Sequence, residues 1–77
     1  MKFKFQQITR QGLWTSECVF EGDYADIVAQ VVQGHVLGQP RAAIEHGSDR
    51  VIFALDADGQ ATPASAALFG IGATQAA

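Results

Sequence analysis

Two runs of alternating apolar and polar side chains at the start of the chain predict an antiparallel hairpin. The runs and the turn between them are Phe3–Gln7, Trp14–Phe20 and Gln11-Gly12. In this register the opposed pairs are Phe3 with Phe20, Phe5 with Cys18 and, on the other surface, Lys2 with Glu21. A slip by one residue would expose the aromatic rings and bury the lysines, so the pattern favours this register.

The residues after Gly22 change from a two-residue period to the three- and four-residue spacing of a helix. Asp23 is suited to cap the first turn, and Asp26 adds negative charge at the positive end of the helix dipole. The apolar stripe comprises Tyr24, Ile27, Val28, Val31, Val32 and His35. We therefore predict a helix over 23–37, ended by Gly38 or, if it stops earlier, by Gly34.

A second hairpin is predicted after Pro40, with strands over 41–46 and 51–55 and a type II′ turn at Gly47-Ser48. The opposed pairs would be Ile44 with Val51, Ala42 with Phe53 and, on the other surface, Glu45 with Arg50. Because proline is favoured at the first position of a helix, a short helix over 40–46 is an alternative for the first of these strands.

The last third of the chain contains a turn signal at 56–59 and a short C-terminal helix that starts after Thr62-Pro63 and docks Leu68 and Phe69. We expect one domain over 1–70 and a flexible tail over 71–77. The predicted fold is α+β: a two-layer, four-stranded, mainly antiparallel sheet (ββαββ) with one long helix on one face. That face would carry Phe3, Phe5, Phe20, Ile44, Val51 and Phe53.

Eight acidic and five basic side chains give the chain a formal net charge of −3. Direct nucleic-acid binding is not favoured, because phosphate recognition needs clustered lysine and arginine. No apolar run is long enough to span a bilayer and the N-terminus has no signal-peptide pattern, so we expect a cytoplasmic protein without membrane contact. Four acids follow the first strand closely: Glu17, Glu21, Asp23 and Asp26.

Candidate catalytic chemistry is sparse. Cys18 could pair with His35 or His46 as a nucleophile with its base, but the hairpin register places Cys18 among phenylalanines, where a structural role is favoured. The two histidines lack further ligands at metal-binding spacing, and Asp56-Ala57-Asp58-Gly59 lacks the remaining acids of a calcium loop. We expect no enzymatic activity, metal or cofactor.

Trp14 has two possible uses, packing in the core or anchoring a partner. With Lys2, Lys4 and Arg10 it could also form a small single-stranded nucleic-acid-binding face, which is the alternative function. A core this small also favours self-association, and a homodimer could form through an edge strand or through an apolar patch of Leu13, Val19 and Ile52.

The order hairpin, helix, hairpin over residues 1–56 resembles the layout of some small phage- or mobile-element-encoded anti-CRISPR inhibitors. The resemblance concerns layout and transfers no site residues. It implies a non-catalytic inhibitor that occupies a surface on a larger ribonucleoprotein, where guide RNA or target DNA would otherwise bind. The residues expected to contact such a partner are Glu17, Glu21, Asp23, Asp26 and Trp14.

Overall fold

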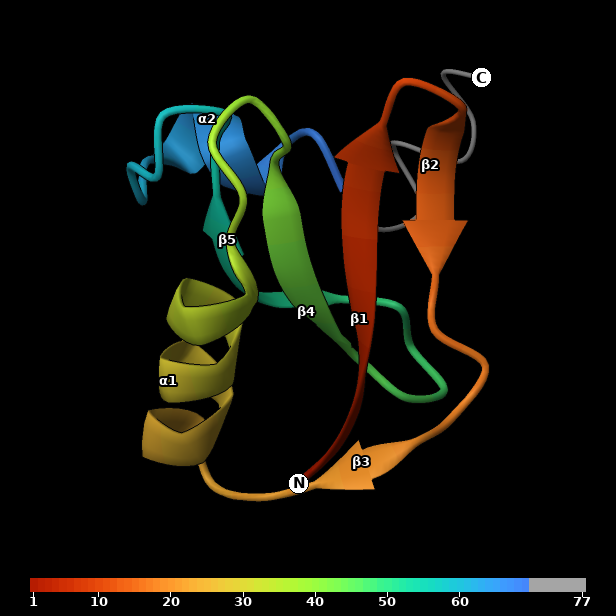
Figure 1. Cartoon of the computed structure of the whole chain (residues 1–77). Helices are drawn as coiled ribbons and strands as arrows, with labels where there is room; N and C mark the ends of the chain where they lie inside the picture. The colour runs from red at the N-terminus through yellow and green to blue at the C-terminus, as the bar shows by residue number, and fades with distance from the viewer. Residues whose placement is uncertain (70–77) are drawn as a thin grey trace.

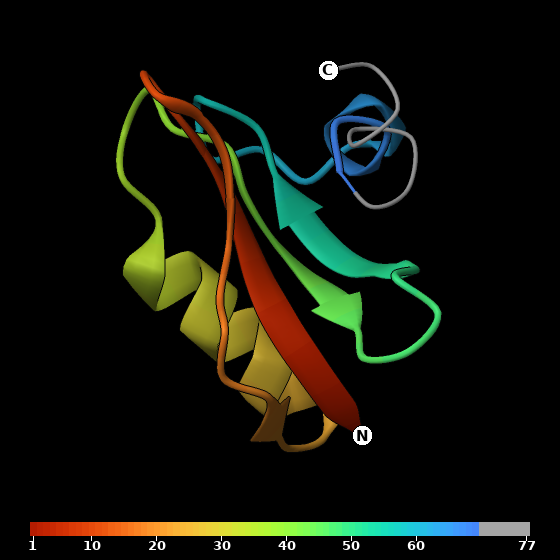
Figure 2. The ribbon, with the colours of Figure 1, turned by 90° about the vertical axis from the view of Figure 1, so that its right-hand side faces the viewer.

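The computed structural model describes residues 1–69, which form an antiparallel sheet with helix α1 on one face and helix α2 on the other (Figures 1 and 2). The elements are β1 (Lys2–Thr9), β2 (Gly12–Thr15), β3 (Phe20–Glu21), α1 (Tyr24–Gly34), β4 (Arg41–Glu45), β5 (Val51–Leu55) and α2 (Pro63–Ala66). The sheet order is β2-β1-β4-β5, and β3 also pairs with β1. The α+β class and the antiparallel sheet are confirmed. The four-stranded ββαββ layout is wrong in detail, because the sheet has five strands. The predicted tail over 71–77 lies outside the described residues.

The predicted second strand over 14–20 divides into β2 and β3, because its two ends pair with β1 in different registers. Lys2 lies opposite Glu21 and Phe3 opposite Phe20, as predicted. Near the turn, however, Gln7 lies opposite Trp14 and Thr9 opposite Gly12, which moves the turn to Arg10-Gln11. The numbers of two opposed residues add up to 23 where β3 pairs with β1 but to 21 where β2 does. The two additional residues are accommodated in the loop between β2 and β3.

Ser16 occupies the position opposite Phe5 that the sequence pattern assigned to Cys18. The Ser16 N–H donates to the Phe5 carbonyl at 2.9 Å, and the Phe5 N–H donates to Ser16 Oγ at 3.0 Å. Ser16 Oγ in turn donates to the Cys18 carbonyl at 3.2 Å. The hydroxyl thus replaces a ladder hydrogen bond where the chain leaves β1, and Cys18 is exposed in the loop.

Helix α1 begins after Asp23, whose carboxylate accepts from the Asp26 N–H at 2.9 Å while Asp26 Oδ2 accepts from the Asp23 N–H at 3.2 Å. It ends at Gly34, the earlier of the two possible ends, and the prediction of a long helix reaching Leu37 is wrong. His35 is already extended at the C-cap, and its Nε2 donates to the Asp56 carbonyl at 2.9 Å. This tertiary contact holds the chain in the turn that leads to β4.

Residues 41–45 form the strand β4 rather than the alternative short helix, since β4 lies between β1 and β5 and bonds to both. Ile44 lies opposite Val51 as predicted, but Ala43, not Ala42, lies opposite Phe53. The register shift leaves Ile52 as an additional residue, a β-bulge that turns Ile52 and Phe53 toward the same cluster. The connecting loop is also longer than a two-residue turn, because Glu45 N–H donates to the Arg50 carbonyl at 2.7 Å across four intervening residues.

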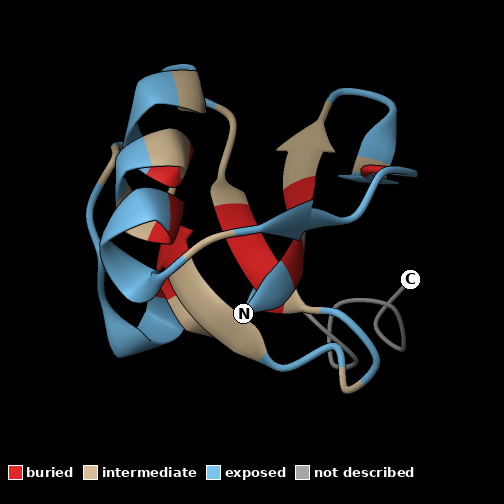
Figure 3. Cartoon of the chain, turned by 90° about the horizontal axis from the view of Figure 1, so that it is seen from below, coloured by how far each residue is buried: buried red, intermediate tan, exposed pale blue. Residues whose placement is uncertain are grey.

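Each sheet face has its own apolar cluster. The buried stretches lie in the strands and on the side of α1 that faces them (Figure 3). The cluster beneath α1 contains Phe3, Phe5, Ile27, Val31, Ala43 and Leu55, with Ile52 and Phe53 packed against it. The opposite cluster contains Ala42, Ala54 and Phe69, with Ile8, Leu13, Val51 and Ala66 around it. The predicted helix face was therefore wrong for Val51 and for Ile44, which lies opposite Lys4, on the other side of β1 from the phenylalanines. Phe69 docks as predicted, but Leu68 is exposed.

Candidate functional site

The four acids expected to meet a partner are all exposed, and three of them lie at one end of the fold. Glu21 lies in β3, while Asp23 and Asp26 cap the adjacent start of α1, at the bottom of Figure 1. The Gly22 N–H donates to the Met1 carbonyl at 3.1 Å and holds this turn against the start of β1. We call Glu21, Asp23 and Asp26 the acidic end, while Glu17 lies in the loop between β2 and β3. No lysine or arginine occurs between Arg10 and Arg41, so Asp23 and Asp26 have no basic neighbour in sequence, while Glu21 lies opposite Lys2.

A shallow hollow of about 320 Å³ lies beside the acidic end, lined by Lys2, Val19, Phe20, Glu21 and His46. Val19 and Phe20 are 42% and 38% exposed. The Phe20 ring is held in place by the buried rings of Phe3 and Phe5, at centroid distances of 5.9 and 5.1 Å. The hollow thus presents a supported apolar surface next to the Glu21 carboxylate. The exposed position of Phe20 was not predicted, because strand alternation alone placed this residue in the core.

Trp14 is not part of the acidic end. It lies opposite Gln7, four residues along β1 from Phe3, which is about 13 Å. Its side chain is 49% exposed, which excludes core packing, one of the two uses expected for it. It shares the α1 face with Phe5, whereas Lys2 and Lys4 alternate onto the opposite face. The structure therefore does not bring Trp14 and these lysines together on one nucleic-acid-binding face.

Within residues 1–69 the Cys18 thiol makes no hydrogen bond with either imidazole. Cys18 is exposed rather than packed among phenylalanines, because Ser16 takes its place in the register. His35 is engaged with the Asp56 carbonyl, and His46 lies in the loop after β4. Asp56 Oδ1 accepts from the N–H groups of Asp58 and Gln60, so this carboxylate organises the predicted turn. Over the same residues, no group of three or more histidine, cysteine or acidic side chains is placed to hold a metal ion.

Arg41 is a charged residue whose role the sequence did not reveal. Its guanidinium stacks over the Phe5 ring at 4.4 Å from the centroid, and Nη1 donates to Gln7 Oε1 at 3.4 Å. It also fills the space beside Gly34, where an added Cβ would lie 2.4 Å from Arg41 Cζ. Burial lowers the pKa of Arg41, and its Nε is buried without a hydrogen-bond partner among residues 1–69. These contacts make Arg41 a packing residue between β4 and α1.

The apolar patch of Leu13, Val19 and Ile52 does not form. Leu13 packs in the cluster on the α2 side, Ile52 packs against the α1 cluster, and Val19 lines the hollow. Neither described helix is long and apolar enough to cross a membrane. In the comparisons with known proteins, no family model, no curated protein and no solved structure matches this chain.

Proposed function

We propose that this protein is a non-catalytic inhibitor or adaptor that binds a basic surface of a larger protein or ribonucleoprotein through its acidic end. The observation that carries the proposal is the hollow in which Val19 and Phe20 are exposed beside Glu21. Exposed aromatic side chains on a rigid support are the usual anchors of protein interfaces. The carboxylates of Glu21, Asp23 and Asp26 at this end would attract a basic partner and select it by charge.

The arrangement supports binding in two stages. The acidic end lies on one side of a chain whose net charge is already negative, so it attracts lysine- and arginine-rich surfaces before contact. Short-range affinity would then come from Phe20, since its ring is fixed against Phe3 and loses little conformational freedom on binding. A preformed apolar contact flanked by carboxylates suits a groove that normally holds nucleic acid.

The sharpest form of the proposal is an anti-CRISPR inhibitor that occupies the guide-RNA or target-DNA channel of a CRISPR surveillance complex. The layout resemblance and the acidic end both favour this form. Purified surveillance complexes loaded with guide RNA provide the test. We expect stoichiometric binding to at least one complex, loss of its target-DNA binding, and weaker binding as salt increases.

Matched variants locate the surface. The variant Glu21→Gln removes the carboxylate that lines the hollow, and Phe20→Ser removes the exposed ring. Each should weaken binding at least about tenfold, a typical loss at an interface hot spot. Asp58→Asn is the control, because Asp58 is an exposed acid in the turn after β5, outside the acidic end.

Two results would contradict this proposal. One is an Asp58→Asn variant that loses as much affinity as the Glu21→Gln variant. The other is absence of binding to every complex tested, together with salt-sensitive binding to a single-stranded oligonucleotide. That second result would favour the alternative of a nucleic-acid-binding module.

A further inference from the structure

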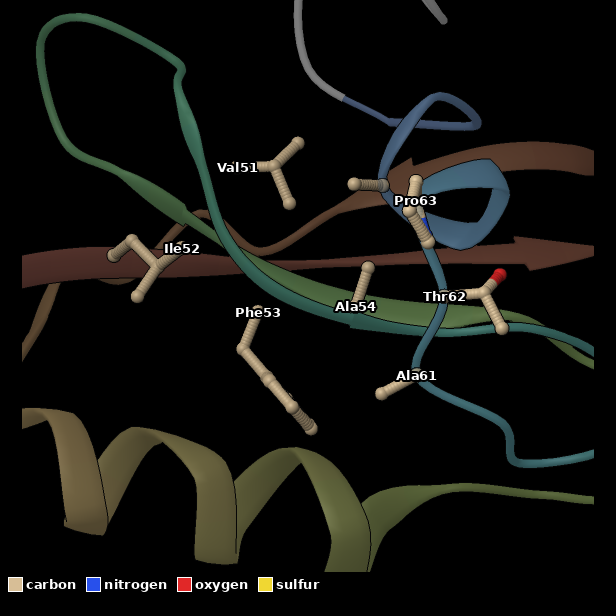
Figure 4. A pocket seen from close by; sticks show the side chains of 8 residues that line it. Val51, Ile52, Phe53, Ala54, Ala61, Thr62 and Pro63 are labelled. Carbon is tan, nitrogen blue, oxygen red and sulfur yellow. The ribbon is translucent and has the colours of Figure 1, made fainter.

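The two edges of the sheet differ in how far they are protected from pairing with another chain. At the β5 edge the bulge at Ile52 interrupts the strand, and Figure 4 shows the segment Ala61–Pro63 beside it. The space between this segment and β5 is a hollow of about 320 Å³ lined mainly by apolar side chains. Bulges and covering segments are the usual protection of an edge strand. The β2 edge has a regular register with β1 and no bulge.

The hydrogen bonds of β2 show which of its backbone groups face outward. Because the Ser16 N–H donates to the Phe5 carbonyl, the alternation of an antiparallel ladder makes Gln7 and Trp14 the next hydrogen-bonded pair. The N–H and C=O groups of Leu13 and Thr15 therefore point away from β1. Within residues 1–69 no backbone hydrogen bond from outside the ladder reaches either residue. The edge thus offers two donors and two acceptors.

We propose that β2 pairs antiparallel with β2 of a second copy of this chain, about a two-fold axis at Trp14. Leu13 of each copy then lies opposite Thr15 of the other, so all four outward groups of each edge are used. The two Trp14 side chains, each 49% exposed, meet across the axis on the α1 face. An aromatic cross-strand pair is among the more favourable contacts in antiparallel sheets. The pairing joins two sheets into one continuous sheet.

The charges next to β2 favour a second copy as the partner strand. The stretch from Arg10 to Glu17 has a base at one end, an acid at the other and no charge between them. Both side chains are exposed, and neither has a hydrogen-bond partner within residues 1–69. Antiparallel pairing about Trp14 places Glu17 of one copy opposite Gln11 of the other, adjacent to Arg10. Parallel pairing would instead place like charges side by side, so the charge pattern selects the antiparallel two-fold arrangement.

Sedimentation velocity of the purified protein alone tests the proposal. A four-residue strand forms a small interface, so we expect monomer at about 10 μM and dimer by about 1 mM. Thr15→Pro removes an outward N–H without breaking a hydrogen bond between the backbones of β2 and β1, and should stay monomeric at both concentrations. Thr15→Val is the matched control. Both variants lose the hydrogen bond that Gln6 Nε2 donates to Thr15 Oγ1, but only the valine variant keeps the backbone N–H at position 15. Thr15→Val should dimerise like the original protein.

Two further variants test the register. Arg10→Glu or Glu17→Arg alone should raise the dissociation constant roughly 2- to 30-fold, and the double reversal should restore it, because each dimer contains two exposed opposite-charge contacts. In a Cys18→Ser background, Trp14→Cys places one cysteine at the axis, where the Cα atoms of a non-hydrogen-bonded pair lie about 4.5 Å apart. It should form an intermolecular disulfide on oxidation, while Tyr24→Cys in the same background should not.

The proposal is overturned by a protein that remains monomeric at about 1 mM, or by a folded Thr15→Pro variant that still dimerises. It is also overturned if Tyr24→Cys cross-links as efficiently as Trp14→Cys. These measurements contain no partner protein, so their failure would leave the proposed function of the acidic end untouched. Conversely, loss of binding at the acidic end would not affect dimerisation through β2.

Discussion

Replacement of Ser16 by alanine tests the cause of the break between β2 and β3. Ser16 is 7% exposed, and its Oγ accepts the Phe5 N–H at 3.0 Å at the point where β2 leaves the ladder. Alanine keeps the backbone bond from the Ser16 N–H to the Phe5 carbonyl but removes the acceptor for the Phe5 N–H. Phe5 is itself buried, so water cannot easily replace that acceptor.

The expected loss follows from these two partners of the hydroxyl. A buried donor left without an acceptor costs about 1–3 kcal/mol. The second partner, the carbonyl of Cys18, belongs to an exposed residue and can bond to water instead, so it adds little. We therefore expect Ser16→Ala to lower the free energy of unfolding by about 1–3 kcal/mol. For a domain of this size that is a large part of the total, which is typically about 4–12 kcal/mol.

Urea unfolding followed by tryptophan fluorescence measures the change. With an m-value of about 1 kcal/mol/M, the midpoint should fall by about 1 M or more. Ser48→Ala is the matched control. Ser48 Oγ also accepts from a backbone N–H, that of Arg50 at 3.2 Å, and it donates to Glu45 Oε1, but both bonds lie in the loop after β4, where water can replace them. The control should change stability by no more than about 0.5 kcal/mol. A Ser16→Ala loss no greater than that of Ser48→Ala would refute the assignment of Ser16 as the substitute for a ladder hydrogen bond.

Two other substitutions test local features of α1. Asp23→Ala removes the helix N-cap and should lower the free energy of unfolding by about 1 kcal/mol, measured by thermal unfolding; an unchanged midpoint would contradict the capping role. Gly34→Ala should be more destabilising in the original protein than in an Arg41→Ala background, because the added methyl group meets the guanidinium. A double-mutant cycle should give a coupling energy of about 0.5–3 kcal/mol, and additivity of the two changes would disprove that contact.

The sequence was informative about the start of the fold because alternation and charge agreed there. Lys2 opposite Glu21 and Phe3 opposite Phe20 follow from a two-residue period alone. The two-residue period gave the wrong position for Cys18, because Cys18 lies in the loop between β2 and β3. The alternation of apolar and polar residues within each of these strands is not changed by the loop. A register change by an even number of residues keeps each side chain on the same face of the sheet. Because the registers of β2 and β3 on β1 differ by two residues, the apolar pattern does not reveal the loop.

The candidate site was only partly predictable for a related reason. The four acids were found from composition, since charged side chains are almost always exposed. The exposed position of Phe20 was not, because whether an aromatic residue at the end of a strand lies in the core or at its rim depends on what covers it. Helix α1 packs against β4 and β5, whereas Phe20 lies in β3 on the other side of β1, so Phe20 is at an uncovered margin.

The residue pattern was enough to predict the pairing at the start of β1, the Asp23 helix start and the turn at 56–59, because each depends on residues close together along the chain. The folded structure was needed to place the end of α1, the residues of β4 that face the helix, and the packing of Arg41 against Phe5 and Gly34. These features depend on contacts between segments distant in sequence, whose free energies outweigh the small local preferences of any single segment.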